Sequence, residues 1–91
     1  EAQSIGLVNI VTEDSREALM AEAEKLARQM MAKGPKALML AKIAINYGSE
    51  TDLNTGLMIE RLAQTIAFST EDRKEGTAAF LEKRPAKFTG R

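Results

Sequence analysis

The sequence contains no cysteine, no histidine and no tryptophan. The absence of cysteine excludes a disulfide framework and a thiolate nucleophile. The absence of histidine removes the most common general base and the most common zinc ligand. No apolar run approaches the roughly 20 residues that a membrane-spanning helix needs, so we predict no membrane partner.

The sequence also lacks an excess of charge of either sign, because 13 basic residues balance 13 acidic ones. Proteins that bind nucleic acids normally carry a basic excess on one face, and we therefore predict no nucleic-acid partner. The six glycines are scattered and form no phosphate-binding loop. A hydrophobic fraction of 44% and a charged fraction of 29% are typical of a globular protein.

The length of 91 residues suits one small domain with a modest core. Domains of this size are marginally stable, and partner surfaces often help to hold them together. The first residue is Glu1 rather than methionine, and we expect the chain to begin inside a longer reading frame or to have been processed.

Residues 1–11 are predicted to form an extended lead. Ile5 to Val11 reads IGLVNIV, a short run rich in β-branched residues and bounded by polar ones, which indicates an extended segment or a short strand. A lone strand cannot satisfy its own backbone hydrogen bonds, so this segment needs a partner to pair or pack with.

The chain between Ser15 and Arg84 is predicted to be mostly helical, because apolar residues recur there at three- and four-residue spacing, and Lys87–Arg91 is predicted to be a short tail. The fold class is therefore mainly α, with short connections that bring neighbouring helices together. Capping and turn residues predict where the four helices begin and end. The first follows the turn at Thr12–Ser15, and the second runs from about Pro35 to Tyr47. The third begins near Thr51 or Asp52, and the fourth runs from Ser69–Asp72 to Lys83-Arg84.

Two features of the second helix go beyond its bounds. Gly34 suits the left-handed position that ends many helices, and Pro35 suits the start of the next one. Apolar residues between Leu38 and Ile45 cover a wide arc of the helix, which favours burial between neighbours on more than one side.

The acidic residues offer no clear catalytic arrangement. Glu60 lies within the third helix beside an apolar stripe, where a solvated or salt-bridged position is the simpler interpretation. Glu71, Asp72 and Glu75 resemble a carboxylate cluster, but acids near the start of a helix also complement its dipole. We predict no metal site from them.

The hydroxyl residues Ser15, Ser69 and Thr70 are candidate nucleophiles only if a base lies nearby. The sequence contains no histidine to act as that base, and helix capping accounts for all three. We therefore predict no catalytic residue in this chain.

Phe80 to Arg84, with the sequence FLEKR, is the most suggestive local feature. An aromatic ring beside two cations at a helix end could hold an anionic, ring-bearing ligand such as a nucleotide. Alternatively, Phe80 belongs to the core, and Lys83 and Arg84 complement the helix dipole.

Five short pieces of the sequence together extend over nearly the whole chain. They are Glu1-Ala2 with Ile5–Val11; Pro35, Ala37, Lys42 and Ile45; Leu53, Gly56, Leu57 and Glu60; Phe68–Asp72 with Glu75-Gly76; and Ala79–Arg84 with Phe88 and Gly90. Single pieces are weak signals, but taken in this order they resemble the C-terminal part of the enoyl-CoA hydratase/isomerase (crotonase) superfamily. Pro85 departs from the family pattern, one place earlier than the proline often found there.

The resemblance implies that residues 12–91 are the helical domain of a crotonase-like fold, and that residues 1–11 lead from a missing N-terminal spiral domain. Such helical domains cover the active site and assemble subunits into trimers, often paired as hexamers. In this family the N-terminal domain supplies the oxyanion hole and, in hydratases, two glutamates. The chain alone is therefore expected to be inactive.

The resemblance also implies a parent enoyl-CoA hydratase, which adds water to trans-2-enoyl-CoA in fatty-acid or related acyl-CoA metabolism. The CoA thioester is then the substrate, and no cofactor is expected. Phe80 and Lys83 match the aromatic residue and the lysine that reach the CoA nucleotide in this family, often across a subunit boundary.

Alternatives to the hydratase stay open on the sequence. In the first alternative, the parent is an enoyl-CoA isomerase or another enzyme of the superfamily. In the second, the chain is a stand-alone helical oligomerisation module. The expected location is the cytoplasm of a bacterium or the mitochondrial matrix of a eukaryote.

Overall fold

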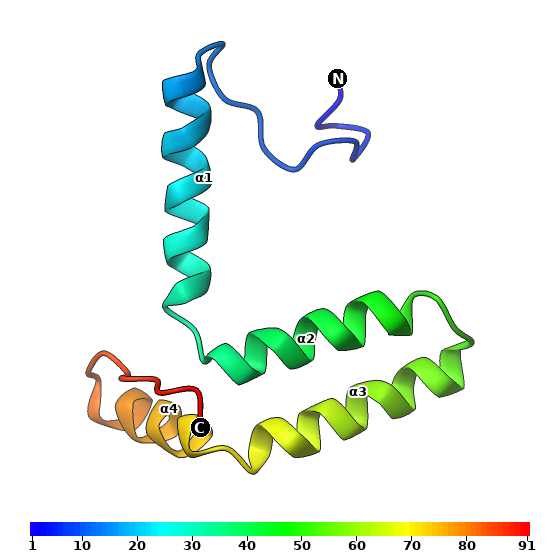
Figure 1. Ribbon diagram of the computed structural model, residues 1–91, viewed down its shortest axis with the longest axis vertical. Coiled ribbons are helices and arrows are strands. Elements are labelled where there is room, and N and C mark those ends of the chain that lie inside the picture. The colour runs from blue at the N-terminus through cyan, green and yellow to red at the C-terminus, as the bar shows by residue number, and fades with distance from the viewer. The chain divides into compact units, whose positions relative to one another are not determined.

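The computed structural model describes residues 1–91 and contains four helices and no strand, which confirms the predicted mainly α fold (Figure 1). The chain divides into two compact units, Glu1–Met30 and Met31–Arg91, which are described separately. None of the helices is long and apolar enough to cross a membrane. The helices are α1 (Arg16–Met31), α2 (Pro35–Gly48), α3 (Leu53–Phe68) and α4 (Glu71–Glu82).

The first unit begins with turns rather than with a strand. The Ile5 N–H donates to the Glu1 carbonyl at 3.1 Å, and the Leu7 N–H donates to the Ala2 carbonyl at 2.9 Å. The strand alternative for residues 5–11 is therefore wrong, because no neighbouring strand is present to pair with this backbone and local turns satisfy part of it.

Ser15 caps the start of α1, as predicted: its hydroxyl oxygen accepts a hydrogen bond from the Ala18 N–H at 3.0 Å. The helix has an apolar stripe, but none of its residues is buried. Leu19, Leu26 and Met30 on this stripe are exposed.

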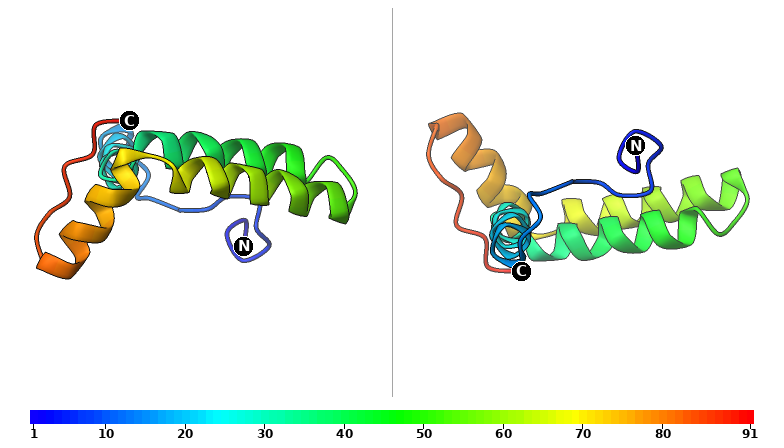
Figure 2. Two further views of the ribbon diagram at one scale, coloured as in Figure 1. Left: turned by 90° about the horizontal axis from the view of Figure 1, so that it is seen from below. Right: turned by 90° about the horizontal axis from the view of Figure 1, so that it is seen from above.

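Within the second unit, α2 and α3 run antiparallel and pack side by side (Figure 2). Gly48 and Gly56 allow the two helices to approach closely at the end where they are joined. A Cβ atom on Gly56 would lie 3.1 Å from the Gly48 carbonyl oxygen, which is closer than an ordinary van der Waals contact. Small residues at this point therefore set the distance between the helices.

The predicted left-handed conformation of Gly34 is wrong. Its φ of −60° and ψ of 123° are extended, and it stands at the N-cap of α2. The cause is Pro35, which follows at the first helical position and disfavours helical or left-handed backbone in the residue before it. Gly34 is also buried, and a Cβ atom there would lie 3.7 Å from the Asp72 side chain.

The helical hairpin of α2 and α3 leaves much apolar surface uncovered. Leu40 is the only buried residue of α2, and α3 has none. The wide apolar arc predicted for α2 is therefore covered mainly where it meets α3. Exposed apolar side chains of the hairpin include Met39, Ile43, Ile45, Leu57, Met58, Leu62 and Ile66.

The last helix, α4, is capped at both ends by its own sequence. The Thr70 hydroxyl oxygen accepts a hydrogen bond from the Arg73 N–H at 3.2 Å, and Glu71 and Asp72 place negative charge in the first turn. After Lys83 the chain reverses, and residues 85–91 return along the helix as a C-terminal tail (Figure 1).

Candidate functional site

The two residues predicted to reach a nucleotide lie in and just beyond the last turn of α4. Phe80 is 83% exposed, so it does not belong to a core formed within this chain. Lys83 is the C-cap and adopts a left-handed conformation, with φ of 53° and ψ of 41°. The Arg84 N–H donates to the Ala79 carbonyl at 3.0 Å, as in a Schellman motif, and this bond closes the helix end.

Lys83 presents a free cation at this helix end. Its side chain is exposed, and none of the ion pairs in the chain involves it. An exposed, unpaired ammonium group beside an exposed aromatic ring can meet an anionic ligand without first breaking an internal ion pair. The geometry is therefore compatible with the role predicted for both residues.

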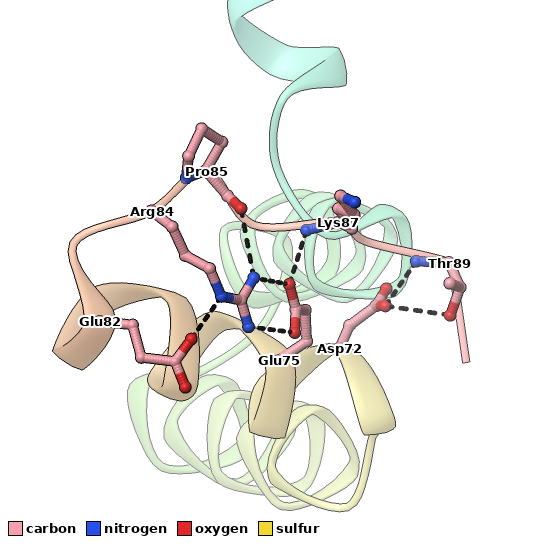
Figure 3. Close-up of polar contacts among 7 residues, drawn as sticks. All are labelled: Asp72, Glu75, Glu82, Arg84, Pro85, Lys87 and Thr89. Carbon is pink, nitrogen blue, oxygen red and sulfur yellow. Dashed lines mark hydrogen bonds and ion pairs between the residues drawn. The ribbon is translucent and has the colours of Figure 1, made fainter.

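Arg84, the second cation of the same segment, is engaged inside the molecule (Figure 3). Its guanidinium donates to the two carboxylate oxygens of Glu75 at 2.6 and 3.0 Å, and its Nε donates to Glu82 at 2.5 Å. Such fork-shaped pairing fixes the arginine side chain. The positive charge available to a ligand is therefore that of Lys83 rather than of both cations.

The hydrogen bonds around Glu75 lower the pKa of its carboxyl group. The hydrogen bonds from Arg84, followed by the one from the Lys87 backbone N–H at 2.8 Å, lower the pKa of Glu75 from 4.5 to about 2. Conversely, hydrogen bonds to Glu75 and then Glu82 raise the pKa of Arg84. Both partners are consequently charged at neutral pH.

Asp72 holds the C-terminal tail and is only 6% exposed. Its carboxylate accepts hydrogen bonds from the backbone N–H groups of Thr89, at 2.6 Å, and Gly90, at 2.8 Å. The Asp72 N–H in turn donates to the Arg91 carbonyl at 2.9 Å. Figure 3 shows Asp72 and Glu75 directed toward different parts of the tail.

The acids that resemble a cluster in the sequence therefore do not converge. Glu71 pairs with Lys74 at 2.9 Å, whereas Asp72 and Glu75 each bind the tail. No group of three or more acids lies close enough to hold a metal ion. Sequence reasoning missed the tail contacts, because the donors lie 12 to 18 residues further along the chain.

An apolar groove of about 470 Å³ lies beside Phe80 in the second unit. Its wall includes all three phenylalanines of the chain, Phe68, Phe80 and Phe88. The Arg73 guanidinium carbon lies 4.8 Å from the centre of the Phe68 ring, within the range of a cation–π contact. Phe88 approaches α4 at Gly76, where a Cβ atom would lie 3.3 Å from the ring. The groove can therefore receive a flat or apolar group.

The remaining candidate residues are Glu60 and the hydroxyl residues, and the hydroxyl residues make contacts at helix ends. Glu60 is exposed on α3 and lines a shallow groove beside α2 with Ala41 and Ala44. The hydroxyl of Ser69 donates to the Ile66 carbonyl at 2.7 Å, at the end of α3. Like Ser15 and Thr70, it serves a helix end, which confirms the capping interpretation.

Comparison with known proteins gives one consistent family. The family model described as enoyl-CoA hydratase/isomerase matches residues 1–91. The mitochondrial methylglutaconyl-CoA hydratase of Mus musculus is 46% identical over 92 residues, covering 99% of this chain and 29% of its own length. The crotonyl-CoA hydratase of Syntrophomonas wolfei is 46% identical over 88 residues, covering 97% of this chain and 33% of its own.

A solved structure agrees in fold. The enoyl-CoA hydratase of Bacillus anthracis superimposes with a TM-score of 0.91 and is 39% identical, with 99% of this chain and 34% of that chain covered. The chain thus spans about a third of the length of the proteins that it matches.

Proposed function

The chain belongs to the enoyl-CoA hydratase/isomerase family, and we propose that it forms the C-terminal helical part of an enoyl-CoA hydratase. The observation that carries this proposal is the match of almost the whole chain, at 46% identity, to proteins named as hydratases. The reaction would be the addition of water across the double bond of a trans-2-enoyl-CoA. The hydratase names favour this reaction over isomerisation.

In this proposal the chain binds and packs, and it does not react. The oxyanion hole and the two glutamates that handle water and the α-proton belong to the part of the enzyme that precedes it. Glu60 and Glu75 are not assigned to that chemistry, because Glu75 is held by Arg84 and Glu60 lies on the α2–α3 hairpin. The chain on its own would therefore be inactive.

Phe80 and Lys83 would bind the nucleotide end of the CoA thioester. Lys83 would meet the phosphate charge, and Phe80 would pack on the adenine or the pantetheine. Their exposure and the lack of an ion pair at Lys83 support this role. The contacts would supply binding energy far from the reacting carbon, which serves to hold the substrate in place.

The α2–α3 hairpin would supply subunit packing. Its exposed apolar side chains are of the kind that a homo-oligomer buries, and we propose a trimer or a hexamer for the whole enzyme. Its location would be the mitochondrial matrix in a eukaryote, as the name of the mouse relative suggests, or the cytoplasm in a bacterium.

The test is to express the complete reading frame that contains this chain and to assay it with crotonyl-CoA and with a trans-3-enoyl-CoA. Hydration of crotonyl-CoA as the faster reaction is the expected result. Isomerisation without hydration would replace the proposal with an enoyl-CoA isomerase. An unrelated upstream domain, or none, with neither activity would favour a stand-alone helical module.

A further inference from the structure

The backbone at Lys83 is the one place where a residue other than glycine has a positive φ, of 53°. Residues with a Cβ atom rarely adopt this conformation, because the Cβ atom crowds the following carbonyl oxygen. Such a conformation persists when the surrounding contacts hold it in place. The contacts on either side of Lys83 therefore fix the direction in which its side chain leaves the backbone.

The backbone bond from the Arg84 N–H to the Ala79 carbonyl closes this turn, and side-chain contacts of the two neighbours of Lys83 add to it. Arg84 donates to Glu75 through both terminal nitrogens and to Glu82 through Nε, so the residues before and after Lys83 are tied together. Glu75 also accepts the Lys87 backbone N–H at 2.8 Å. One carboxylate on α4 thus fixes the arginine and the chain that follows it.

We propose that the Glu75–Arg84 ion pair is a positioning device that holds Lys83 in place to meet the CoA nucleotide. The proposal rests on the proposed function of Lys83. In this proposal Glu75 and Arg84 do not touch the ligand: Glu75 neutralises Arg84, and their ion pair reinforces the backbone bonds that close the turn at Lys83. The site then carries one free cation, on a backbone that is held in place, instead of two free cations.

A purely structural role for the ion pair makes a different prediction. A contact that only stabilises the tail would change the amount of folded enzyme and affect all substrates alike. A contact that positions Lys83 would change KM for a substrate with the nucleotide and not for one without it. Crotonyl-CoA and crotonyl-pantetheine, which lacks the nucleotide, separate the two roles.

The experiment measures kcat and KM of the full-length enzyme with both thioesters. Lys83→Ala is expected to raise KM for crotonyl-CoA by about 10-fold, the effect of losing one charge-assisted contact. Glu75→Gln is expected to raise it about 3-fold, because a neutral amide loosens the fork without removing Lys83. Neither variant should change KM for crotonyl-pantetheine.

Two further variants complete the design. The double variant Glu75→Gln with Lys83→Ala should show no higher KM than Lys83→Ala alone, because the ion pair acts through the lysine. Glu71→Gln is the matched control: it removes the same charge and an ion pair with Lys74 from the same helix, and KM should not change. If Glu75→Gln does not fold, Arg84→Lys replaces it, since lysine keeps the charge and loses the fork.

The outcomes separate the two proposals. If Lys83→Ala leaves KM for crotonyl-CoA unchanged, the nucleotide-binding role of Lys83 fails and the positioning role fails with it. If Lys83→Ala raises KM but Glu75→Gln does not, only the positioning role is overturned. Equal changes with both thioesters, or additive effects in the double variant, would also overturn it.

Discussion

At the scale of single residues, Asp72 has two roles: it lies in the first turn of α4, and it binds the C-terminal tail. Its position in the first turn of α4 complements the helix dipole, as the sequence predicts. Its burial and its bonds to Thr89 and Gly90 appear only in three dimensions. No local pattern reports such a contact, because the donors are backbone N–H groups, which every residue but proline carries.

Asp72→Ala should therefore release the tail. The substitution leaves the backbone N–H groups of Thr89 and Gly90 without their acceptor, and we expect a loss of about 2 kcal/mol in the free energy of unfolding. Urea unfolding checks this value. Glu71→Ala, next to Asp72 but exposed, is the control and should have a much smaller effect. Equal midpoints for Asp72→Ala and the unchanged chain would show that the tail contacts contribute nothing.

Glu75 gives the tail a dependence on pH. Its pKa is lowered from 4.5 to about 2, so the ion pair contributes fully above pH 4.5 and is lost as the pH falls toward 2. The unfolding midpoint should fall over this window and should fall less in Glu75→Gln, which has no carboxylate to protonate. Thermal unfolding at pH 7, 4.5 and 3 measures both. The same acid sensitivity in both proteins would rule out Glu75 as its source.

At the scale of elements, helix ends are the features that the sequence predicts best. Asp52 caps α3 by accepting the Thr55 N–H at 3.0 Å, and Thr70 caps α4. These bonds join residues three apart, so local sequence is sufficient to predict them. Gly34 shows the opposite case, because the restriction imposed by Pro35 outweighs the preference of glycine for a left-handed helix end.

The contact between α2 and α3 allows a test of close packing. Gly56→Ala places a Cβ atom 3.1 Å from the Gly48 carbonyl oxygen. The cost of that overlap should exceed the roughly 1 kcal/mol that alanine gains over glycine within a helix, for a net loss of about 1 kcal/mol. Gly48→Ala is the matched control, because its Cβ atom would lie an ordinary 3.9 Å from Gly56. A chain stabilised by Gly56→Ala in urea unfolding would show that the helices separate easily.

At the scale of the whole molecule, the sequence predicts helices more completely than it predicts their packing. The mainly α fold follows from periodicity and caps, and the fold of known hydratases agrees with it. The tail contacts and the split between a free Lys83 and an engaged Arg84 do not follow, because they depend on pairing across distant positions. The family resemblance singled out Phe80 and Lys83, and local spacing alone left a core position for Phe80 open.

The exposed apolar surface predicts self-association of the isolated chain. Leu40 and Ala79 are the only buried apolar residues, while the α2–α3 hairpin exposes methionine, leucine and isoleucine side chains. Large exposed apolar areas favour association in water. Light scattering at increasing concentration should show a rising mean mass. A monomer that persists at high concentration would argue against subunit packing through this hairpin.

The most direct test of the central claim, that this chain binds and packs but does not react, is crotonyl-CoA hydration by the purified 91-residue chain across gel-filtration fractions. The full-length enzyme serves as the positive control. The account predicts no hydration in the fractions that contain the chain, because the proposed function assigns the oxyanion hole and the paired glutamates to another part of the enzyme. Hydration activity that co-elutes with the chain would contradict it and would return Glu60 and Glu75 to consideration as catalytic acids.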